Sequence, residues 1–340
     1  MLKHEIKDGP LEHSEYTSIL NNYNKQTNNQ INIDSFLHWV SKNHNGACLH
    51  SILRNKDNEI VGHCCVFPFF VKYNSSLLKA GKAEYLFLLP EYRSMQTENY
   101  SINIPAYILL KELYKYALKM SKYHFVLISA PSGVNNLHIM CGAKSLNFSL
   151  HECLMINNPL DAALYTPNIT IHKKIILFFV GIFQKIFCPI AFFLFSINNR
   201  MEKSYVDTDE NLIGFNNDEV FIKWRYPNKK FTRIKNDKTD VFLKNGSKKD
   251  FLRVCQINKM EDNPAVFFKD CLKISKEQNS LGFRISVYVN SPISKHLIKK
   301  LRLLGFLVAK REREILIISD NDIFLKNESW NMSDFYLLFK

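Results

Sequence analysis

The sequence predicts a mixed α/β protein of the α+β kind, built from two tandem lobes that each hold a mostly antiparallel sheet flanked by helices. Three observations carry this prediction. The chain has 340 residues, about twice the length of a typical domain. Strand-like and helix-like patterns follow one another in nearly the same order in its two halves, and a long apolar segment separates the halves. A diverged internal duplication accounts for all three.

The first half contains strand-like runs before and after one long helix. Hairpin-type residues separate the first two runs, and apolar residues at helical spacing predict the long helix. In chain order we expect strands Ala47 to Arg54, Ile60 to Tyr73 and Ala83 to Leu89, helix Ile104 to Ser121, strand His124 to Ala130, helix Asn135 to Gly142, and strand Leu150 to Ile156. The last strand is expected to close the first lobe.

The second half repeats most of this order. It begins with a hairpin around Asn245-Gly246 and continues with helix, strand, helix and strand. The expected elements are strands Val241 to Lys244 and Phe251 to Ile257, helix Pro264 to Gln278, strand Phe283 to Val289, helix Ile293 to Leu304, and strand Leu307 to Ser319.

These patterns predict four segments. They are a polar N-terminal extension (1–35), a first lobe (36–158), an apolar inter-lobe segment (159–204) and a second lobe (205–340). The apolar segment is most apolar at residues 175–197, which is long enough to span a bilayer. However, Gln184 and Lys185 lie at its centre, and Pro189 would kink a helix there. A membrane-surface or re-entrant anchor, a buried inter-lobe helix and a true span therefore all stay open.

The composition is that of an ordinary globular protein, with 46% hydrophobic and 23% charged residues. The formal charge of +13 is compatible with a solvated surface or with a basic face for an anionic partner, but no dense basic run interleaved with aromatics points to nucleic acid. The eight cysteines show no zinc-finger spacing, so we expect free thiols and no metal. The N-terminal residues hold no apolar stretch, and we expect a cytoplasmic protein, peripheral to the inner face of the membrane if the apolar segment binds lipid.

Three stretches resemble the GNAT acyltransferase family. They are DNEIVGHCCVFP (Asp57 to Pro68), AEYLFLLPEYRS (Ala83 to Ser94) and SGVNNLHIMCGA (Ser132 to Ala143). FIKWRYP (Phe221 to Pro227) is similar to the opening of a second lobe in tandem versions found among surface-polysaccharide genes. A Fem-like protein also has two lobes of this type. The resemblance covers the strand and helix order of both halves.

The resemblance implies that acetyl-CoA or another acyl-CoA binds the first lobe. The pantetheine arm would lie between the fourth and fifth strands like an added strand, with the pyrophosphate at a helix N-terminus. The positions that it implies for cofactor binding are Leu88, Leu89, Arg93, Ser94, Gln96 and Asn135. The loop departs from the family pattern, because Gln96 and Glu98 stand where glycines are usual. No acyl-CoA is expected in the degenerate second lobe.

Acyl transfer needs a group that accepts the acceptor's proton and one that protonates the leaving thiolate. The resemblance implies Glu84 as the base and His138 as the acid, with Tyr85 and Tyr92 as substitutes. A solvent-facing carboxylate and a packed helix histidine are the structural alternatives for Glu84 and His138.

We therefore expect an N- or O-acyltransferase whose acceptor is an amine or a hydroxyl, such as a saccharide or a lipid-linked precursor. A Fem-like aminoacyl-tRNA-dependent transferase, for which tRNA would be the partner, and a non-catalytic binding protein are the alternatives.

Overall fold

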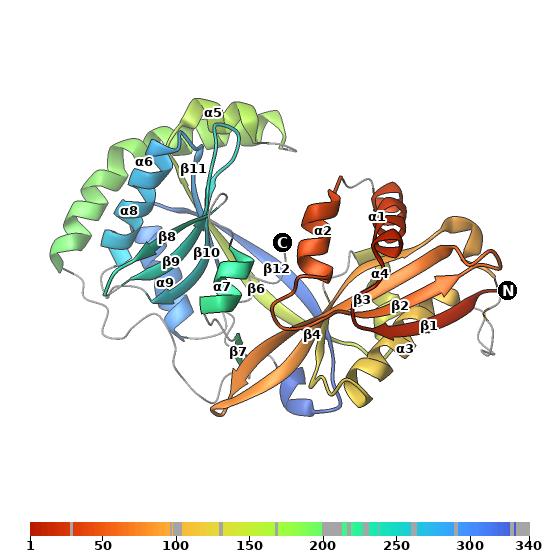
Figure 1. The fold of residues 1–340 in the computed structure, drawn as a ribbon. Helices are drawn as coiled ribbons and strands as arrows, with labels where there is room; N and C mark the ends of the chain where they lie inside the picture. The colour runs from red at the N-terminus through yellow and green to blue at the C-terminus, as the bar shows by residue number, and fades with distance from the viewer. Residues whose placement is uncertain are drawn as a thin grey trace. The chain divides into compact units, whose positions relative to one another are not determined.

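The computed structural model describes residues 1–27, 30–95, 97, 104–128, 132–166, 169–198, 213–215, 219–226, 231–237, 239–259, 264–288, 292–326 and 330. The chain forms two compact units, each made of separate stretches of sequence. Unit 1 consists of Met1–Asn147, Glu210–Trp224 and Glu314–Trp330, and unit 2 of Phe148–Asp209, Arg225–Arg313 and Asn331–Lys340. Both units are mixed α/β, with a mostly antiparallel sheet and flanking helices (Figure 1).

The sheet of unit 1 has the strand order β1-β2-β3-β4-β5-β12. Its strands are β1 (Lys3–Asp8), β2 (Leu49–Arg54), β3 (Ile60–Tyr73), β4 (Ser76–Leu88), β5 (Val126–Ile128) and β12 (Leu307–Ile318). The pair β4–β5 is parallel and the other printed pairs of these strands are antiparallel. A short strand β7 (Gly214–Phe215) also pairs with β3.

Helices cover both faces of this sheet (Figure 1). Helices α1 (His13–Thr27) and α2 (Ile33–Val40) pack on one face, where Ile19, Phe36 and Cys65 belong to the same buried cluster. Helix α3 (Pro105–Lys119) packs on the other face, and α4 (Ser132–Met140) lies against α3. Helix α7 (Glu219–Arg225) and the 3-10 helices η1 (Pro90–Tyr92) and η2 (Asp322–Leu325) complete the described elements around this unit. Each strand of the sheet centre thus contributes alternate side chains to two separate cores.

The first residues of the chain are part of unit 1, whereas the sequence predicted a polar extension over 1–35. Strand β1 pairs with β2 along its whole length, and Leu2, Tyr16 and Ile19 are buried. The sequence also missed the first half of β4. A turn at Asn74-Ser75, with φ of 48° and 59°, reverses the chain tightly and pairs Tyr73 with Ser76. Positive φ at both turn residues matches the twist of the flanking strands.

The strands of unit 2 follow the order β6-β11-β10-β9-β8. The strands are β6 (Lys144–Ile156), β8 (Phe231–Lys235), β9 (Asp240–Lys244), β10 (Leu252–Lys259) and β11 (Gly282–Tyr288). Helices α8 (Pro264–Glu277) and α9 (Pro292–Leu303) bury Phe268 and Leu301 against these strands. Helix α5 (Pro159–Tyr165) precedes α6 (Ile171–Asn198), of which Ile171–Ala191 is long and apolar enough to cross a membrane by length and composition alone.

The closing strands pair differently from what the sequence predicted. Residues Leu150 to Ile156 form a strand as expected, but they pair with β11 of unit 2. The end of β12 (Leu316 to Ile318) instead pairs with β5 of unit 1. The expectation that Leu150 to Ile156 closes the first lobe is therefore wrong. Apolar alternation identifies a strand, but it does not encode which distant strand will be the neighbour.

Candidate active site

Strand β4 runs on beyond the described part of β5. The parallel ladder joins Gly81 to Val126 and Ala83 to Ile128, which is the last described residue of β5, whereas β4 runs on to Leu88. Beyond Ala83, the edge of β4 that faced β5 has no partner strand among the described residues. Free backbone groups on a strand edge can bond an extended ligand as an added strand would.

A bulge in β4 lies directly after this point. Cys65 pairs with Glu84 and His63 pairs with Phe87, so Tyr85 and Leu86 together oppose Cys64. Tyr85 has a φ of 54°, a conformation that is costly for a bulky residue. Its ring lies in an edge-to-face contact with Phe36, with centroids 4.8 Å apart. Burial raises the pKa of the Tyr85 hydroxyl, so this group is protonated at neutral pH.

Glu84 lies between the end of the ladder and the bulge. Its side chain is on the α1/α2 face, because it pairs with Cys65, which belongs to the core under these helices. The carboxylate is 29% exposed and forms an ion pair with Lys82, whose side chain is nearly buried. Glu84 is therefore accessible to a ligand and has a cationic neighbour.

His138 lies on the opposite face of the same sheet. It is 3% exposed on α4, and its Nδ1 is 2.8 Å from the hydroxyl of Tyr114, a residue of the α3 core. Burial lowers the pKa of His138 to about 4, so the imidazole is neutral at pH 7. The structure does not bring Glu84 and His138 together on one face, and of the two only Glu84 has a partly exposed polar group.

Leu88 and Leu89 were both predicted to bind the cofactor. The Leu89 N–H donates to the Val61 carbonyl at 2.9 Å, so this group is used within the sheet. Successive residues of a strand direct their backbone groups to opposite edges. The backbone of Leu88 is therefore the one that faces the free edge of β4.

The loop after β4 is described only in part. Arg93 and Ser94 follow η1 and are exposed, and the amides of Tyr92, Arg93 and Met95 bond to carbonyls of the preceding turn. Gln96, the third predicted loop residue, lies outside the described residues. Helix α3 begins at Pro105 without a side-chain cap. An uncapped helix N-terminus offers N–H groups and a favourable dipole to a phosphate.

The last predicted cofactor residue is Asn135 of α4. The nitrogen of its side-chain amide has a hydrogen-bond partner, and the oxygen has none. Its Nδ2 donates to Glu314 of β12, which also accepts a hydrogen bond from Ser145. Its Oδ1 is buried and has no hydrogen-bond partner. A buried acceptor of this kind is costly unless it is bonded, so Asn135 has capacity for a donor from a ligand.

A cavity of about 440 Å³ opens between α1, the β2–β3 hairpin and the residues that follow β4. Its lining is mostly polar and includes Ser14, Ser18, Asn22, Glu59, Glu91 and Tyr92. This cavity could not be predicted from the sequence, because its walls come from segments that are far apart in the chain.

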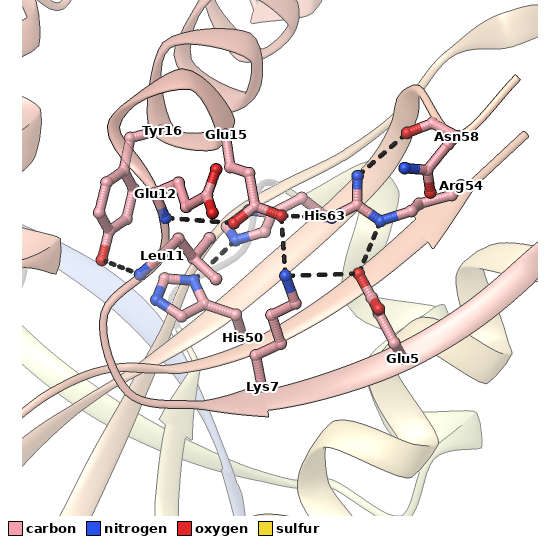
Figure 2. A network of polar contacts seen from close by, with 10 residues as sticks. All are labelled: Glu5, Lys7, Leu11, Glu12, Glu15, Tyr16, His50, Arg54, Asn58 and His63. Carbon is pink, nitrogen blue, oxygen red and sulfur yellow. Dashed lines mark hydrogen bonds and ion pairs between the residues drawn. The ribbon is translucent and has the colours of Figure 1, made fainter.

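A charged network forms part of the cavity wall (Figure 2). Arg54 lies at its centre. Its guanidinium donates to Glu5 Oε1 at 2.7 Å, to the Asn58 carbonyl at 3.1 Å, and to Glu15. Lys7 Nζ also contacts Glu15 Oε1 at 2.8 Å. Burial would raise the pKa of Glu15, but hydrogen bonds from Lys7, the Glu12 backbone and Arg54, together with the charge of Lys7, lower it, so the Glu15 carboxylate is ionised at neutral pH.

His50, His63 and Cys65 form a buried cluster below this network, and Figure 2 shows the two histidines. One ligand atom from each lies within 4.8 Å of the others, a donor set that a divalent metal such as zinc accepts. However, His63 Nε2 is 3.1 Å from His50 Nδ1, and His63 Nδ1 is 3.2 Å from the Tyr85 carbonyl. His50 Nε2 is buried without a partner. These contacts describe a hydrogen-bonded histidine pair in which both ring nitrogens of His63 already have partners.

Solved structures share this architecture. A probable N-acyltransferase of unknown function from Enterococcus faecalis has a TM-score of 0.51 and 12% identity, over 93% of this chain and 72% of that one. A GCN5-related N-acetyltransferase from Anabaena variabilis has a TM-score of 0.52 and 9% identity, over 94% and 73%. A third, from Kribbella flavida, has a TM-score of 0.51 and 10% identity, over 92% and 70%.

These likenesses establish that the chain has a GNAT-type fold. No protein-family model matches the sequence, and no curated protein matches it. At identities of 9 to 12%, these structures show the fold of this chain and not its activity. An activity has to be argued from the chain's own residues.

Proposed function

We propose that unit 1 is an acyltransferase, which moves an acyl group, most simply acetyl, from coenzyme A to an amine or hydroxyl. The observation that carries this proposal is the bulge in β4 soon after the described β4–β5 ladder, with Glu84 between the ladder and the bulge. The edge of β4 beyond Ala83 would bind the pantetheine arm as an added strand, with the carboxylate beside it.

Glu84 serves as the general base in this proposal. The acceptor nitrogen or oxygen attacks the thioester carbonyl and forms the new C–N or C–O bond, and its proton passes to the Glu84 carboxylate. The C–S bond then breaks, and the CoA thiolate takes up a proton. Lys82 forms an ion pair with the Glu84 carboxylate and so holds it in place beside the reacting groups. The buried and neutral His138 fits a structural role better than that of the acid.

Acyl-CoA would be held by separate contacts along its length. The free backbone of Leu88 would bond the pantetheine amides, and the buried Oδ1 of Asn135 would accept a further N–H. The N-terminus of α3 would receive the pyrophosphate, with Arg93 and Ser94 as exposed polar groups on the loop that leads to it.

The acceptor would occupy the cavity beside α1. Ser14, Ser18 and Asn22 offer hydroxyl and amide groups, and Glu59 and Glu91 offer carboxylates. Such walls suit a hydroxyl-rich or amine-bearing ligand such as a saccharide, including the head of a lipid-linked precursor. The cavity and Glu84 both belong to the α1/α2 side of the unit 1 sheet.

We further propose that the two units are copies of one ancestral unit, of which only the first is catalytic. Strand β10 repeats the features of β4. Its parallel pairing with β11 ends at Val254 with Ile285, a bulge follows at Cys255, and the strand runs on to Lys259. As Glu84 directly follows the described β4–β5 ladder, so the bulged Cys255 directly follows the β10–β11 ladder. Burial raises the pKa of its thiol, so it cannot replace the carboxylate as a base at neutral pH.

Titration calorimetry with acetyl-CoA tests the proposal. We expect one acetyl-CoA per chain. The Arg93→Ala variant should bind about 5- to 150-fold more weakly, as expected for a lost charged hydrogen bond of about 1–3 kcal/mol. Arg302→Ala, which removes an exposed arginine from α9 of unit 2, is the matched control. Binding of aminoacyl-tRNA in place of acetyl-CoA would favour the Fem-like alternative, and binding of neither would favour a non-catalytic protein.

A further inference from the structure

Helix α6 turns one polar residue inward and a row of large apolar residues outward. Gln184, the polar residue at the centre of the apolar segment, is 2% exposed and faces the sheet of unit 2. The outward side carries Ile175, Phe179, Phe183, Ile186 and Ile190, each 51–63% exposed. A surface helix normally turns its apolar stripe to the core and its polar residues to water.

The inward side of α6 is fixed to unit 2 by specific contacts. The Gln184 amide accepts from the Ile156 N–H at 2.9 Å and donates to the Leu154 carbonyl at 3.0 Å, so it bonds the backbone of β6 at two points. It also donates to the Gly305 carbonyl at 2.8 Å. Gly181 allows close approach, because a Cβ there would lie 2.9 Å from atoms of Ile156 and Pro159.

These contacts decide how the helix can meet a lipid bilayer. A transmembrane helix is surrounded by lipid or by other spanning helices. One side of α6 is instead hydrogen-bonded to strand β6 of an α/β sheet, and a span would break these bonds and take this partner away from the β6 backbone groups. The outward side alone is available to lipid. This geometry fits a helix that lies in the plane of the membrane surface.

The charges of α6 favour anionic lipid as the binding partner of its outward side. Residues 171–198 contain Lys173, Lys174 and Lys185 and no aspartate or glutamate. Lys173 and Lys185 are exposed. Basic residues beside an apolar stripe bind anionic headgroups while the apolar side chains enter the acyl boundary. A second copy of the chain is a poorer occupant, because antiparallel pairing about the helix centre would bring Lys185 close to its own counterpart.

We propose that the outward face of α6, defined by Ile175, Phe179, Phe183, Ile186 and Ile190, docks in the plane of an anionic membrane surface. Unit 2 stays folded behind the helix, and Gln184 holds the helix to it. This docking is independent of the proposed acyl transfer, since it uses none of the residues proposed to bind acyl-CoA. A chain that fails to bind acetyl-CoA should still bind vesicles, and the reverse also holds.

Vesicle sedimentation of the full chain tests this proposal. We expect the protein to sediment with vesicles of phosphatidylcholine and phosphatidylglycerol, and less with phosphatidylcholine alone. The triple variant Phe179→Glu, Phe183→Glu, Ile186→Glu should lose at least tenfold in vesicle affinity. The matched control is Leu77→Glu, Met120→Glu, Leu303→Glu, which changes exposed apolar residues elsewhere and should bind like the wild type. The variant Lys173→Glu, Lys174→Glu should weaken binding to the anionic vesicles about tenfold or more.

Alkaline carbonate washing of vesicle-bound protein separates the in-plane helix from a span. Release into the supernatant supports the proposal, and retention would overturn it in favour of a transmembrane helix. The proposal is also overturned if the wild type stays in the supernatant with anionic vesicles, or if the glutamate triple variant binds as well as the control. A wild-type dimer that the same triple variant converts to a monomer, without lipid binding, would assign the face to a second copy. Circular dichroism of each variant establishes that it is folded.

Discussion

The hydroxyl of Tyr114 lies 2.8 Å from Nδ1 of His138, in the interior between α3 and α4. Burial lowers the pKa of His138 to about 4 in the folded protein, against its ordinary value of 6.5. The unfolded chain therefore takes up a proton more readily than the folded one between these two values. With respect to His138, the free energy of unfolding is therefore highest above about pH 6.5, and it decreases as the pH falls towards 4.

His138→Gln tests this linkage, because glutamine keeps an acceptor for Tyr114 but does not titrate. We expect the free energy of unfolding of the wild type to fall by about 3 kcal/mol more than that of the variant between pH 7 and pH 4. Urea unfolding at a series of pH values measures the difference. Equal pH slopes in the two proteins would show that His138 does not carry the effect.

Removal of Arg54 should destabilise unit 1. Arg54 is nearly buried and forms ion pairs with both Glu5 and Glu15. Arg54→Ala would therefore leave two partly buried carboxylates without this positive charge beside them. We expect a loss of about 2–4 kcal/mol. Arg253→Ala, which removes an arginine from an ion pair with the adjacent Asp250 in unit 2, should cost less, and chemical denaturation compares the two. A loss at Arg54 no larger than at Arg253 would contradict the central role of Arg54 in the network.

Glu84→Gln should lower turnover about a hundredfold or more and leave acetyl-CoA affinity nearly unchanged. The amide keeps the size of the side chain but cannot accept the acceptor's proton. Glu112→Gln is the matched control, because Glu112 is 25% exposed and pairs with Lys115, much as Glu84 is 29% exposed and pairs with Lys82. Once an acceptor is found, steady-state kinetics separate the effect on kcat from that on binding. Wild-type turnover in Glu84→Gln would remove this residue from the mechanism.

The purified protein should contain no stoichiometric zinc at the His50–His63–Cys65 cluster, and a chelator should not lower its Tm. His50 and His63 contact each other, and His63 also contacts the Tyr85 carbonyl. Burial raises the pKa of the Cys65 thiol, which disfavours the thiolate that a metal needs. Elemental analysis together with thermal unfolding in the presence of a chelator checks this. One zinc per chain, with a Tm that falls on chelation, would assign a structural metal site.

Gln184→Leu should destabilise unit 2 by about 2–4 kcal/mol. The change removes three hydrogen bonds and leaves the Ile156 N–H and the Leu154 and Gly305 carbonyls without this partner. Lys185→Leu, at the adjacent exposed position, should be nearly neutral. Denaturant unfolding measures both variants. Equal stability of the two would mean that Gln184 does not fix α6 to the sheet.

Local sequence patterns were sufficient to predict many of the elements. The run Ile60 to Tyr73 was predicted with the bounds that β3 has, and the long helix at Ile104 to Ser121 appears as α3 at Pro105–Lys119. Apolar periodicity and turn residues act over a few positions, so they are visible in one chain. Strand β8 and the first half of β4 were missed, because their polar and charged residues hide the alternation of a strand.

The candidate site was only partly predictable for the same reason. Glu84 and Leu88 could be assigned to a strand from the sequence, but the bulge at Tyr85 and the end of the β4–β5 ladder depend on how strands register with one another. The cavity beside α1 and the network around Arg54 join residues from separate segments, for which a single sequence gives no pairing information.

The sequence by itself determined that this protein has strands and helices in the order of two GNAT-like lobes, and that a long apolar segment joins them. Only the tertiary structure decided that residues Leu150 to Ile156 pair with β11 and that the end of β12 pairs with β5. It also decided that Gln184 faces inward and Phe179 and Phe183 face outward. The physical reason is that periodicity records which side chains share a face, whereas the free energy of long-range packing selects what that face will contact.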